Sequence, residues 1–194
     1  MKIVKPNKIG VQQAVKILKN GGVIIYPTDT AYALGGIFDS KKVTQKILKI
    51  KNRKDKKFTL IASSLKQVEK FFKLNSSQKK LARNFWPGPL SIVVSPRFAV
   101  RVPKNRIVQS LAQQVGKPII ATSANLSGQP TLFDSKKIIA QFQSKKNTRL
   151  NLAGQKPDLL IDSGRLAQTK TSTVVKVVGN KAIVLRSGAV KIES

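Results

Sequence analysis

The hydrophobic pattern alternates between two periods along most of the chain. Segments with apolar residues three and four positions apart predict amphipathic helices, at about 11–20, 40–50, 64–72, 76–85, 107–115 and 136–142. Short, nearly continuous apolar runs predict buried strands, at 23–26, 58–62, 90–95, 98–102, 119–122 and 159–161. Two further apolar segments, 173–178 and 182–186, flank Gly179-Asn180, which predicts a two-residue hairpin. Residues 143–157 read as a polar loop.

This order of elements predicts the fold class. Helices alternate with strands at first, and a hairpin closes the chain. We therefore expect an α/β fold, with one domain over residues 1–194 and a twisted sheet of parallel and antiparallel strands flanked by helices.

Two of the predicted strands end in groups of small polar residues. Thr28, Asp29 and Thr30 follow the first buried strand and Pro27. Residues 122–128, TSANLSG, follow the strand at 119–121. Ligands in open α/β sheets bind beyond the carboxyl ends of strands, so both groups are candidate ligand sites. Their alternatives are a capped turn at 28–30 and an ordinary loop with a helix cap at Ser127.

Several cations stand at positions where a binding role and a structural role compete. Lys51 and Arg53 are two apart, which in an extended segment would direct both side chains the same way and could grip a polyphosphate. Alternatively, they are cations at a helix C-terminus. Arg101 lies in an apolar strand, so it needs an anionic partner, either a ligand or an acid. Arg186 and Ser172 would each pass as ordinary surface residues.

The composition excludes several kinds of catalysis. The chain has no Cys and no His, and Asp and Glu together number 8. Disulfides, thiolate metal sites, thiol nucleophiles and imidazole-based triads are therefore excluded. An enzyme with this composition would work through positive charge, hydroxyls, backbone amides and a few acids.

The formal net charge of +29 implies a polyanionic partner such as nucleic acid, nucleotide or phosphate. Solvated lysines on every helix, reflecting a Lys-rich proteome, would give part of the same excess. Charge alone does not separate an RNA binder from an enzyme that takes ATP. No apolar run approaches a membrane span, and the N-terminus MKIVKPNKIG lacks the core of a signal peptide, so we expect a cytoplasmic protein without a membrane partner.

Eight ordered sequence blocks together resemble one family, the YrdC-type threonylcarbamoyl-AMP synthases. The blocks are YPTDTAYALGG, KNR, WPGPLSIVV, VRVP, PIIATSANLSG, DSG, STVVKV and LRSGAV, and they span roughly residues 8–190. The resemblance implies a twisted mixed sheet around a deep basic cavity. It also implies the short, stand-alone form of the family, without the additional C-terminal domain of the longer branch.

The resemblance further implies an activity. L-threonine, bicarbonate and ATP would give threonylcarbamoyl-AMP and pyrophosphate, for modification of adenosine 37 in tRNAs that read ANN codons. ATP with Mg²⁺ is then a substrate, no tightly bound cofactor is expected, and a transferase takes the product onward. A structured RNA or tRNA is a candidate partner, and a non-catalytic RNA-binding module remains the alternative function.

On the threonine side, the resemblance assigns contacts to four residues. Thr30 matches a substrate contact of the PTDT block, and Arg101 matches the VRVP arginine near the substrate. Thr122 and Ser172 are expected beside the threonine as well. Asp29 is a candidate orienting acid.

On the ATP side, Lys51 and Arg53 match the basic pair that meets the phosphates, and they are the expected catalytic residues through charge stabilisation. No protein nucleophile and no metal ligand from the protein alone are expected. The remaining residues assigned to ATP are Thr122, Ser123, Asn125 and Arg186.

The chain departs from the family pattern at three positions. Lys54 stands where the family has Pro after the basic pair, which leaves the course of residues 54–57 open. Ala33 replaces the usual Gly, so the turn must accept a Cβ there. Lys104, Asn105 and Arg106 follow VRVP where a His is common, so histidine chemistry is not required.

Overall fold

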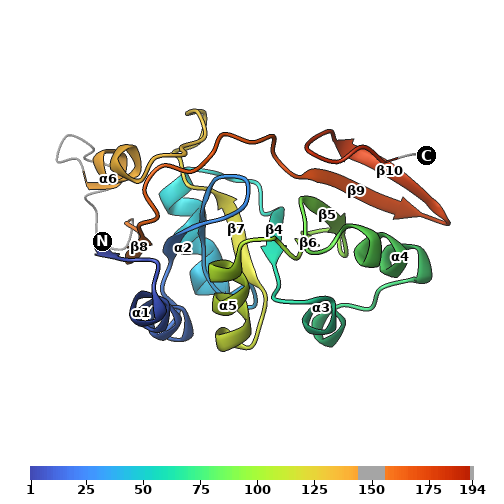
Figure 1. Cartoon of the computed structure of the whole chain (residues 1–194), viewed down its shortest axis with the longest axis horizontal. Coiled ribbons are helices and arrows are strands. Elements are labelled where there is room, and N and C mark those ends of the chain that lie inside the picture. Colours follow the sequence, from blue (N-terminus) through green and yellow to red (C-terminus); the bar gives the residue numbers. More distant parts are fainter. Residues whose placement is uncertain (144–155, 193–194) are drawn as a thin grey trace.

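The structure is a computed structural model, and it describes residues 1–143 and 156–192 (Figure 1). The helices are α1 Lys8–Lys19, α2 Lys41–Lys51, α3 Leu65–Phe71, α4 Ser76–Phe85, α5 Arg106–Val115 and α6 Ser135–Gln143. The strands are β1 Lys2–Val4, β2 Ile24–Pro27, β3 Tyr32–Gly35, β4 Phe58–Ile61, β5 Leu90–Val93, β6 Phe98–Arg101, β7 Ile119–Ser123, β8 Leu159–Ile161, β9 Thr173–Val178 and β10 Lys181–Arg186.

All of these strands belong to one mixed sheet, as the sequence predicts. It is 10-stranded, with the order β1-β8-β2-β3-β7-β4-β6-β5-β9-β10. β7 lies in the middle of the sheet and pairs with a different neighbouring strand at each of its ends. Its residues Ile119–Ala121 pair antiparallel with β4, whereas Thr122 and Ser123 pair with Leu34 and Ala33 of β3. The polar end of β7 is therefore placed beside β3 and the turn that precedes it.

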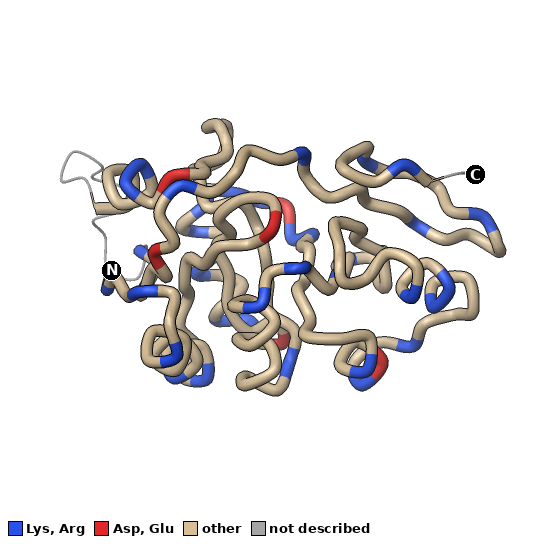
Figure 2. The backbone as a smooth tube through the Cα atoms, viewed as in Figure 1, with Lys and Arg blue, Asp and Glu red and all other residues tan. Residues whose placement is uncertain are grey.

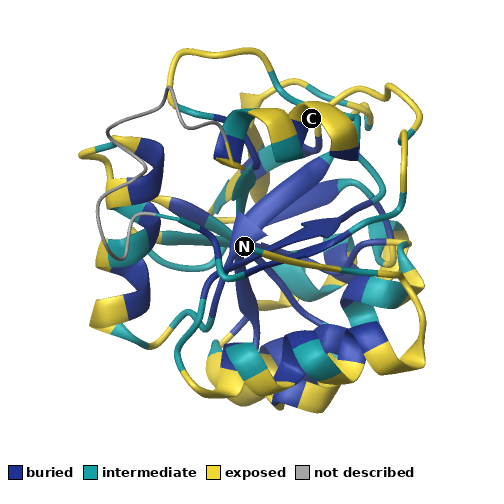
Figure 3. Ribbon diagram, turned by 90° about the vertical axis from the view of Figure 1, so that its left-hand side faces the viewer, coloured by how far each residue is buried: buried dark blue, intermediate teal, exposed yellow. Residues whose placement is uncertain are grey.

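Helices cover both faces of the sheet (Figures 1 and 3), and the side chains of each strand alternate between these faces. Ile24 and Tyr26 of β2 pack in a cluster with apolar residues of α1 and α5. Val23 and Ile25 belong to a second cluster that contains residues of α2 and α6. β2 is thus buried on both faces, which explains its continuous apolar run.

Helix capping follows the sequence closely, with one difference. The Ser64 hydroxyl accepts from the Gln67 N–H at 3.1 Å, which is the first half of the predicted capping box. The Gln67 carboxamide does not return to the Ser64 backbone. It accepts from the Ser63 N–H and donates to the Ala112 carbonyl of α5, so it joins α3 to α5.

Two strands were not predicted from the sequence. β1 has only 3 residues, two of which are exposed, so it is too short to show the apolar pattern of a buried strand. β3 contains Ala33 and Gly35 and reads as part of the preceding turn. The predicted loop at 143–157 lies mostly outside the described residues. Within the part of the chain that is described, no helix has the length and apolar character needed to cross a bilayer.

Candidate active site

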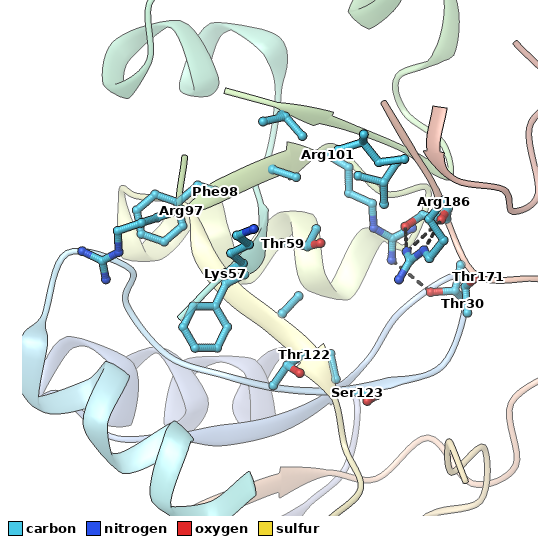
Figure 4. Close-up of a pocket in the computed structure, with 18 of the residues that line it drawn as sticks. Thr30, Lys57, Thr59, Arg97, Phe98, Arg101, Thr122, Ser123, Thr171 and Arg186 are labelled. Carbon is cyan, nitrogen blue, oxygen red and sulfur yellow. Dashed lines mark hydrogen bonds between the residues drawn. The ribbon is translucent and has the colours of Figure 1, made fainter. Parts of the chain in front are cut away.

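A pocket of about 1020 Å³ lies among β3, β4, β6, β7 and the β9–β10 hairpin (Figure 4). Hydroxyl groups of Thr30, Thr59, Thr122 and Ser123 line it. Among the residues that the structure describes, every charged side chain in its lining is a cation, namely Arg53, Lys57, Arg97, Arg101, Lys176 and Arg186. The pocket is therefore suited to an anionic ligand.

The turn at Thr28–Thr30 is both a capped turn and a wall of this pocket. The Thr28 hydroxyl accepts from the N–H groups of Thr30 and Ala31, each at 3.1 Å, and donates to the Ala31 carbonyl at 2.6 Å. Thr28 thereby fixes the turn. The Thr30 side chain lines the pocket, so this capped turn is also part of the pocket wall, and ligand binding there stays a prediction.

Arg101 has the acidic partner that its apolar strand requires. Its Nη1 lies 3.0 Å from Asp29 Oδ1, and its side chain is only 5% exposed. Asp29 Oδ2 also accepts from the Lys104 N–H at 3.2 Å. The other guanidinium nitrogen of Arg101, Nη2, donates to Thr30 Oγ1 at 3.1 Å. Arg101 thus contacts both Asp29 and Thr30. Burial lowers the pKa of Arg101, and the charge of Asp29 opposes that shift.

Arg186 lies at the same end of the pocket as Arg101 (Figure 4). Its Nη2 donates to Ser172 O at 2.8 Å and to Ser172 Oγ at 3.0 Å, and its Nε donates to the same carbonyl. Burial and then the charge of Arg101 lower the pKa of Arg186. Two guanidinium groups that repel each other favour an anion between them. Sequence position separates these arginines widely, and the sheet brings them together.

Lys51 and Arg53 do not extend together into the pocket. Lys51 is the last residue of α2, and Asn52 has the left-handed φ of 51°. Of the two alternatives that the sequence leaves open, the helix end describes this segment and the extended segment does not. Arg53 lines the pocket and is paired with Asp55 at 2.7 Å, while Lys51 is buried behind the lining.

The Lys51 ammonium group holds the loop that follows β7. Its Nζ donates to Ser123 O at 2.7 Å, Asn125 O at 2.6 Å and Asn125 Oδ1 at 2.7 Å. The Asn125 carboxamide also donates to the Gln129 carbonyl. Thr122 and Ser123 therefore face the pocket, whereas Asn125 lies behind it with Lys51.

Stability should depend on pH through Lys51. Burial, and then the charge of Arg53, lowers the pKa of Lys51 from 10.5 to about 8. Between these values the unfolded chain binds the proton and the folded protein releases it, so the contribution of Lys51 to stability rises with pH across that window. We expect the urea midpoint of the wild type, relative to Lys51→Met, to rise from pH about 8 to about 10. Parallel pH profiles would contradict this.

Trp86 has a structural role. Its indole N–H donates to the Leu90 carbonyl at 2.7 Å and closes the corner that Pro87, Gly88 and Pro89 form. The ring packs against the apolar clusters and does not line the pocket.

Comparison with known proteins places this chain in a family. The Sua5/YciO/YrdC family model, described as "Telomere recombination", matches residues 16–188. The chain belongs to this family. A threonylcarbamoyl-AMP synthase of Psychromonas ingrahamii is 37% identical over 76% of this chain and 85% of its own length. The uncharacterized protein YciO of Escherichia coli is 30% identical over 94% of this chain and 91% of its own length.

Solved structures of the Sua5/YciO/YrdC family share the fold. E. coli YciO superimposes with a TM-score of 0.79 and 28% identity, covering 96% of this chain and 94% of that chain. Sua5 of P. abyssi, solved in complex with L-threonine, gives a TM-score of 0.80 and 26% identity over 96% of this chain. The present chain spans 56% of that Sua5 chain, so it corresponds to one part of the larger protein.

Sequence reasoning missed one end of the pocket. Lys57, Arg97 and Phe98 line it opposite Arg101 and Arg186 (Figure 4), and Phe58 belongs to the lining as well. A signal was present, because a cation followed by Phe precedes both of the strands predicted at 58–62 and 98–102. None of these four positions lies in the eight sequence blocks that resemble the family.

Proposed function

We propose that this protein is an L-threonylcarbamoyladenylate synthase, a nucleotidyltransferase that joins L-threonine, bicarbonate and ATP. The observation that carries the proposal is the cationic pocket in which Arg101, Thr30 and Arg186 converge. Two relatives support the proposal. One is a protein named threonylcarbamoyl-AMP synthase, to which this chain is 37% identical, and the other is Sua5, solved in complex with L-threonine.

The reaction needs no protein nucleophile. The threonine amine adds to bicarbonate and forms a carbamate with loss of water. A carbamate oxygen then attacks the α-phosphorus of ATP, the bond to the β-phosphate bridging oxygen breaks, and pyrophosphate leaves with that electron pair. Catalysis by positioning and charge stabilisation suffices for such a displacement. This agrees with a chain that has neither His nor Cys.

At one end of the pocket, Thr30, Arg101 and Ser172 would hold threonine. Asp29 keeps the Arg101 guanidinium in place, so that Nη2 supports the Thr30 hydroxyl. The Thr28 hydroxyl fixes the turn from behind. This arrangement offers a preorganised set of donors for a carboxylate or carbamate oxygen.

ATP would lie along the remaining pocket, with Arg186, Arg53, Thr122 and Ser123 as its polar contacts. Lys51 and Asn125 would act from behind by fixing the backbone of Ser123. Among the described residues no cluster of three or more acids or other metal-binding side chains is present. Mg²⁺ would therefore arrive with ATP and be held by phosphate oxygens and water.

The product implies a place in tRNA modification. A threonylcarbamoyl group on AMP is an activated acyl donor, so a partner transferase would move it to adenosine 37 of tRNAs that read ANN codons. Both steps would take place in the cytoplasm.

The proposal is tested by incubating the purified protein with ATP, Mg²⁺, L-threonine and ¹⁴C-bicarbonate. We expect labelled threonylcarbamoyl-AMP and an equal amount of pyrophosphate, detected by chromatography and mass spectrometry. Omission of threonine or ATP should abolish the label in the product. No labelled product from folded protein with all substrates present would refute the proposal.

A second candidate function, RNA binding without catalysis, is favoured by the net charge of +29. Figure 2 shows Lys and Arg on every helix and in many of the connecting segments, with few acidic residues between them. Electrostatic RNA binding would fall steeply with salt concentration. A measured RNA affinity that is independent of salt would exclude this role.

A further inference from the structure

Two phenylalanines from adjacent strands line the pocket, and Phe98 lies at the end opposite Arg101 (Figure 4). β4 and β6 are parallel neighbours, and Phe58 pairs in register with Phe98. Register partners in adjacent strands point to the same face of the sheet. Both phenylalanines line the pocket, so their rings form part of its wall.

The guanidinium group of an arginine contacts each phenylalanine ring. The Arg53 Cζ lies 5.5 Å from the centroid of the Phe58 ring, and the Arg97 Cζ lies 5.2 Å from the centroid of the Phe98 ring. Cation–π contact holds a guanidinium at a ring and leaves N–H donors free for other partners. Such a group is partly preorganised for phosphate oxygens, to which arginine binds through two parallel hydrogen bonds.

Lys57 joins the same cluster. The Phe58 N–H donates to the Arg97 carbonyl at 2.9 Å, so the residue before Phe58 lies next to Arg97. Lys57 lines the pocket, and its carbonyl accepts from Arg53 Nη2 at 2.8 Å. Asp55 is the acid beside this cluster, it is paired with Arg53, and its side chain is 54% exposed. Within the described part of the chain, neither Lys57 nor Arg97 forms an ion pair.

We infer that Arg53, Lys57 and Arg97, the stacked-arginine cluster, form a polyphosphate subsite that binds the β- and γ-phosphates of ATP and the pyrophosphate that leaves. β6 connects this subsite to the threonine end, because Arg97 precedes the strand and Arg101 ends it. At about 3.3 Å per residue the two backbone positions are roughly 13 Å apart. The displaced pyrophosphate would thus be drawn away from the carbamate.

This inference rests on the proposed function for the identity of the ligand, but its ligand chemistry can be tested alone. The probe is inorganic pyrophosphate with Mg²⁺, and binding is measured by calorimetry. Arg97→Ala is the test variant, because its side chain is exposed and its removal leaves the core intact. Arg83→Ala on α4 is the matched control, since it removes an equal charge from an exposed position outside the pocket lining.

We expect Arg97→Ala to weaken pyrophosphate binding about 10-fold or more, as for loss of a hydrogen bond to a charged group. Arg83→Ala should bind like the wild type. Arg97→Lys keeps the charge but loses the two-pronged geometry, so it should recover only part of the affinity. In turnover, Arg97→Ala should raise KM for ATP and leave KM for threonine unchanged.

Equal pyrophosphate affinities for Arg97→Ala and Arg83→Ala would overturn the inference. Weakened binding of a structured RNA by Arg97→Ala, with unchanged pyrophosphate binding, would also overturn it and assign the cluster to RNA. If the wild type forms no threonylcarbamoyl-AMP while Arg97→Ala weakens pyrophosphate binding, the proposed function fails and the polyphosphate subsite stands.

Discussion

Replacement of Arg101 by alanine should lower kcat/KM for L-threonine by roughly 10²- to 10³-fold, by analogy with loss of one preorganised oxyanion donor. Arg101 is the side chain that connects the partly buried acid Asp29 to the pocket hydroxyl of Thr30. Its loss removes a positive charge from the threonine end and releases the Thr30 side chain. The expected kinetic effect is therefore larger for threonine than for ATP.

The same substitution should also destabilise the protein. It leaves the Asp29 carboxylate without its partner at a site where the Asp29 side chain is only 16% exposed. Removal of one member of a buried ion pair costs about 3–5 kcal/mol. Urea unfolding followed by circular dichroism measures this cost.

A double variant separates activity from stability. In Asp29→Asn/Arg101→Gln both charges are gone, so the unfolding midpoint should return toward that of the wild type. Activity should stay low, because Thr30 has no guanidinium donor. If the double variant recovers threonine turnover together with its stability, Arg101 serves only the fold and the role assigned to it is wrong.

Replacement of Gly35 by alanine should strongly destabilise the fold. A Cβ at Gly35 would overlap the Ile120 carbonyl oxygen, lie 2.7 Å from the Ile120 carbonyl carbon and lie 3.1 Å from the Tyr26 hydroxyl. These atoms belong to the central sheet, and Ile120 accepts a hydrogen bond of 2.7 Å from Tyr26. Backbone there cannot move without disturbing β7, so we expect a loss of about 3 kcal/mol or more.

Gly179→Ala is the control for Gly35→Ala. Gly179 has a φ of 57° in the β9–β10 turn, and no atom lies within 4 Å of the site of its Cβ. Its cost is backbone strain of about 1–2 kcal/mol. Thermal unfolding of both variants tests the difference, and equal midpoints would show that close packing of β3 against β7 is not what Gly35 provides.

The helices could be predicted because local physics decides them. The capping residue Ser40 and the apolar spacing of Val43, Ile47 and Ile50 define α2 without reference to the rest of the chain. β3 could not be predicted in this way. Its four residues are all buried, yet Ala33 and Gly35 are weak strand formers, and the strand is stabilised by partners on both sides.

Strand ends and cations in the sequence point to several residues that line the pocket, but the geometry of these residues depends on tertiary structure. The sequence requires an anion for Arg101 and does not show that Asp29 supplies it. It places Lys51 and Arg53 together, and the left-handed Asn52 directs them apart. The stacked-arginine cluster exists because β4 and β6 pair in one particular register, which no local pattern specifies.

The most direct test is a crystal structure of the protein with L-threonine and a non-hydrolysable ATP analogue. We expect threonine against Thr30 and Arg101, and the β- and γ-phosphates at Arg53, Lys57 and Arg97, within the same pocket. Nucleotide density outside that pocket, or threonine away from Arg101, would contradict it.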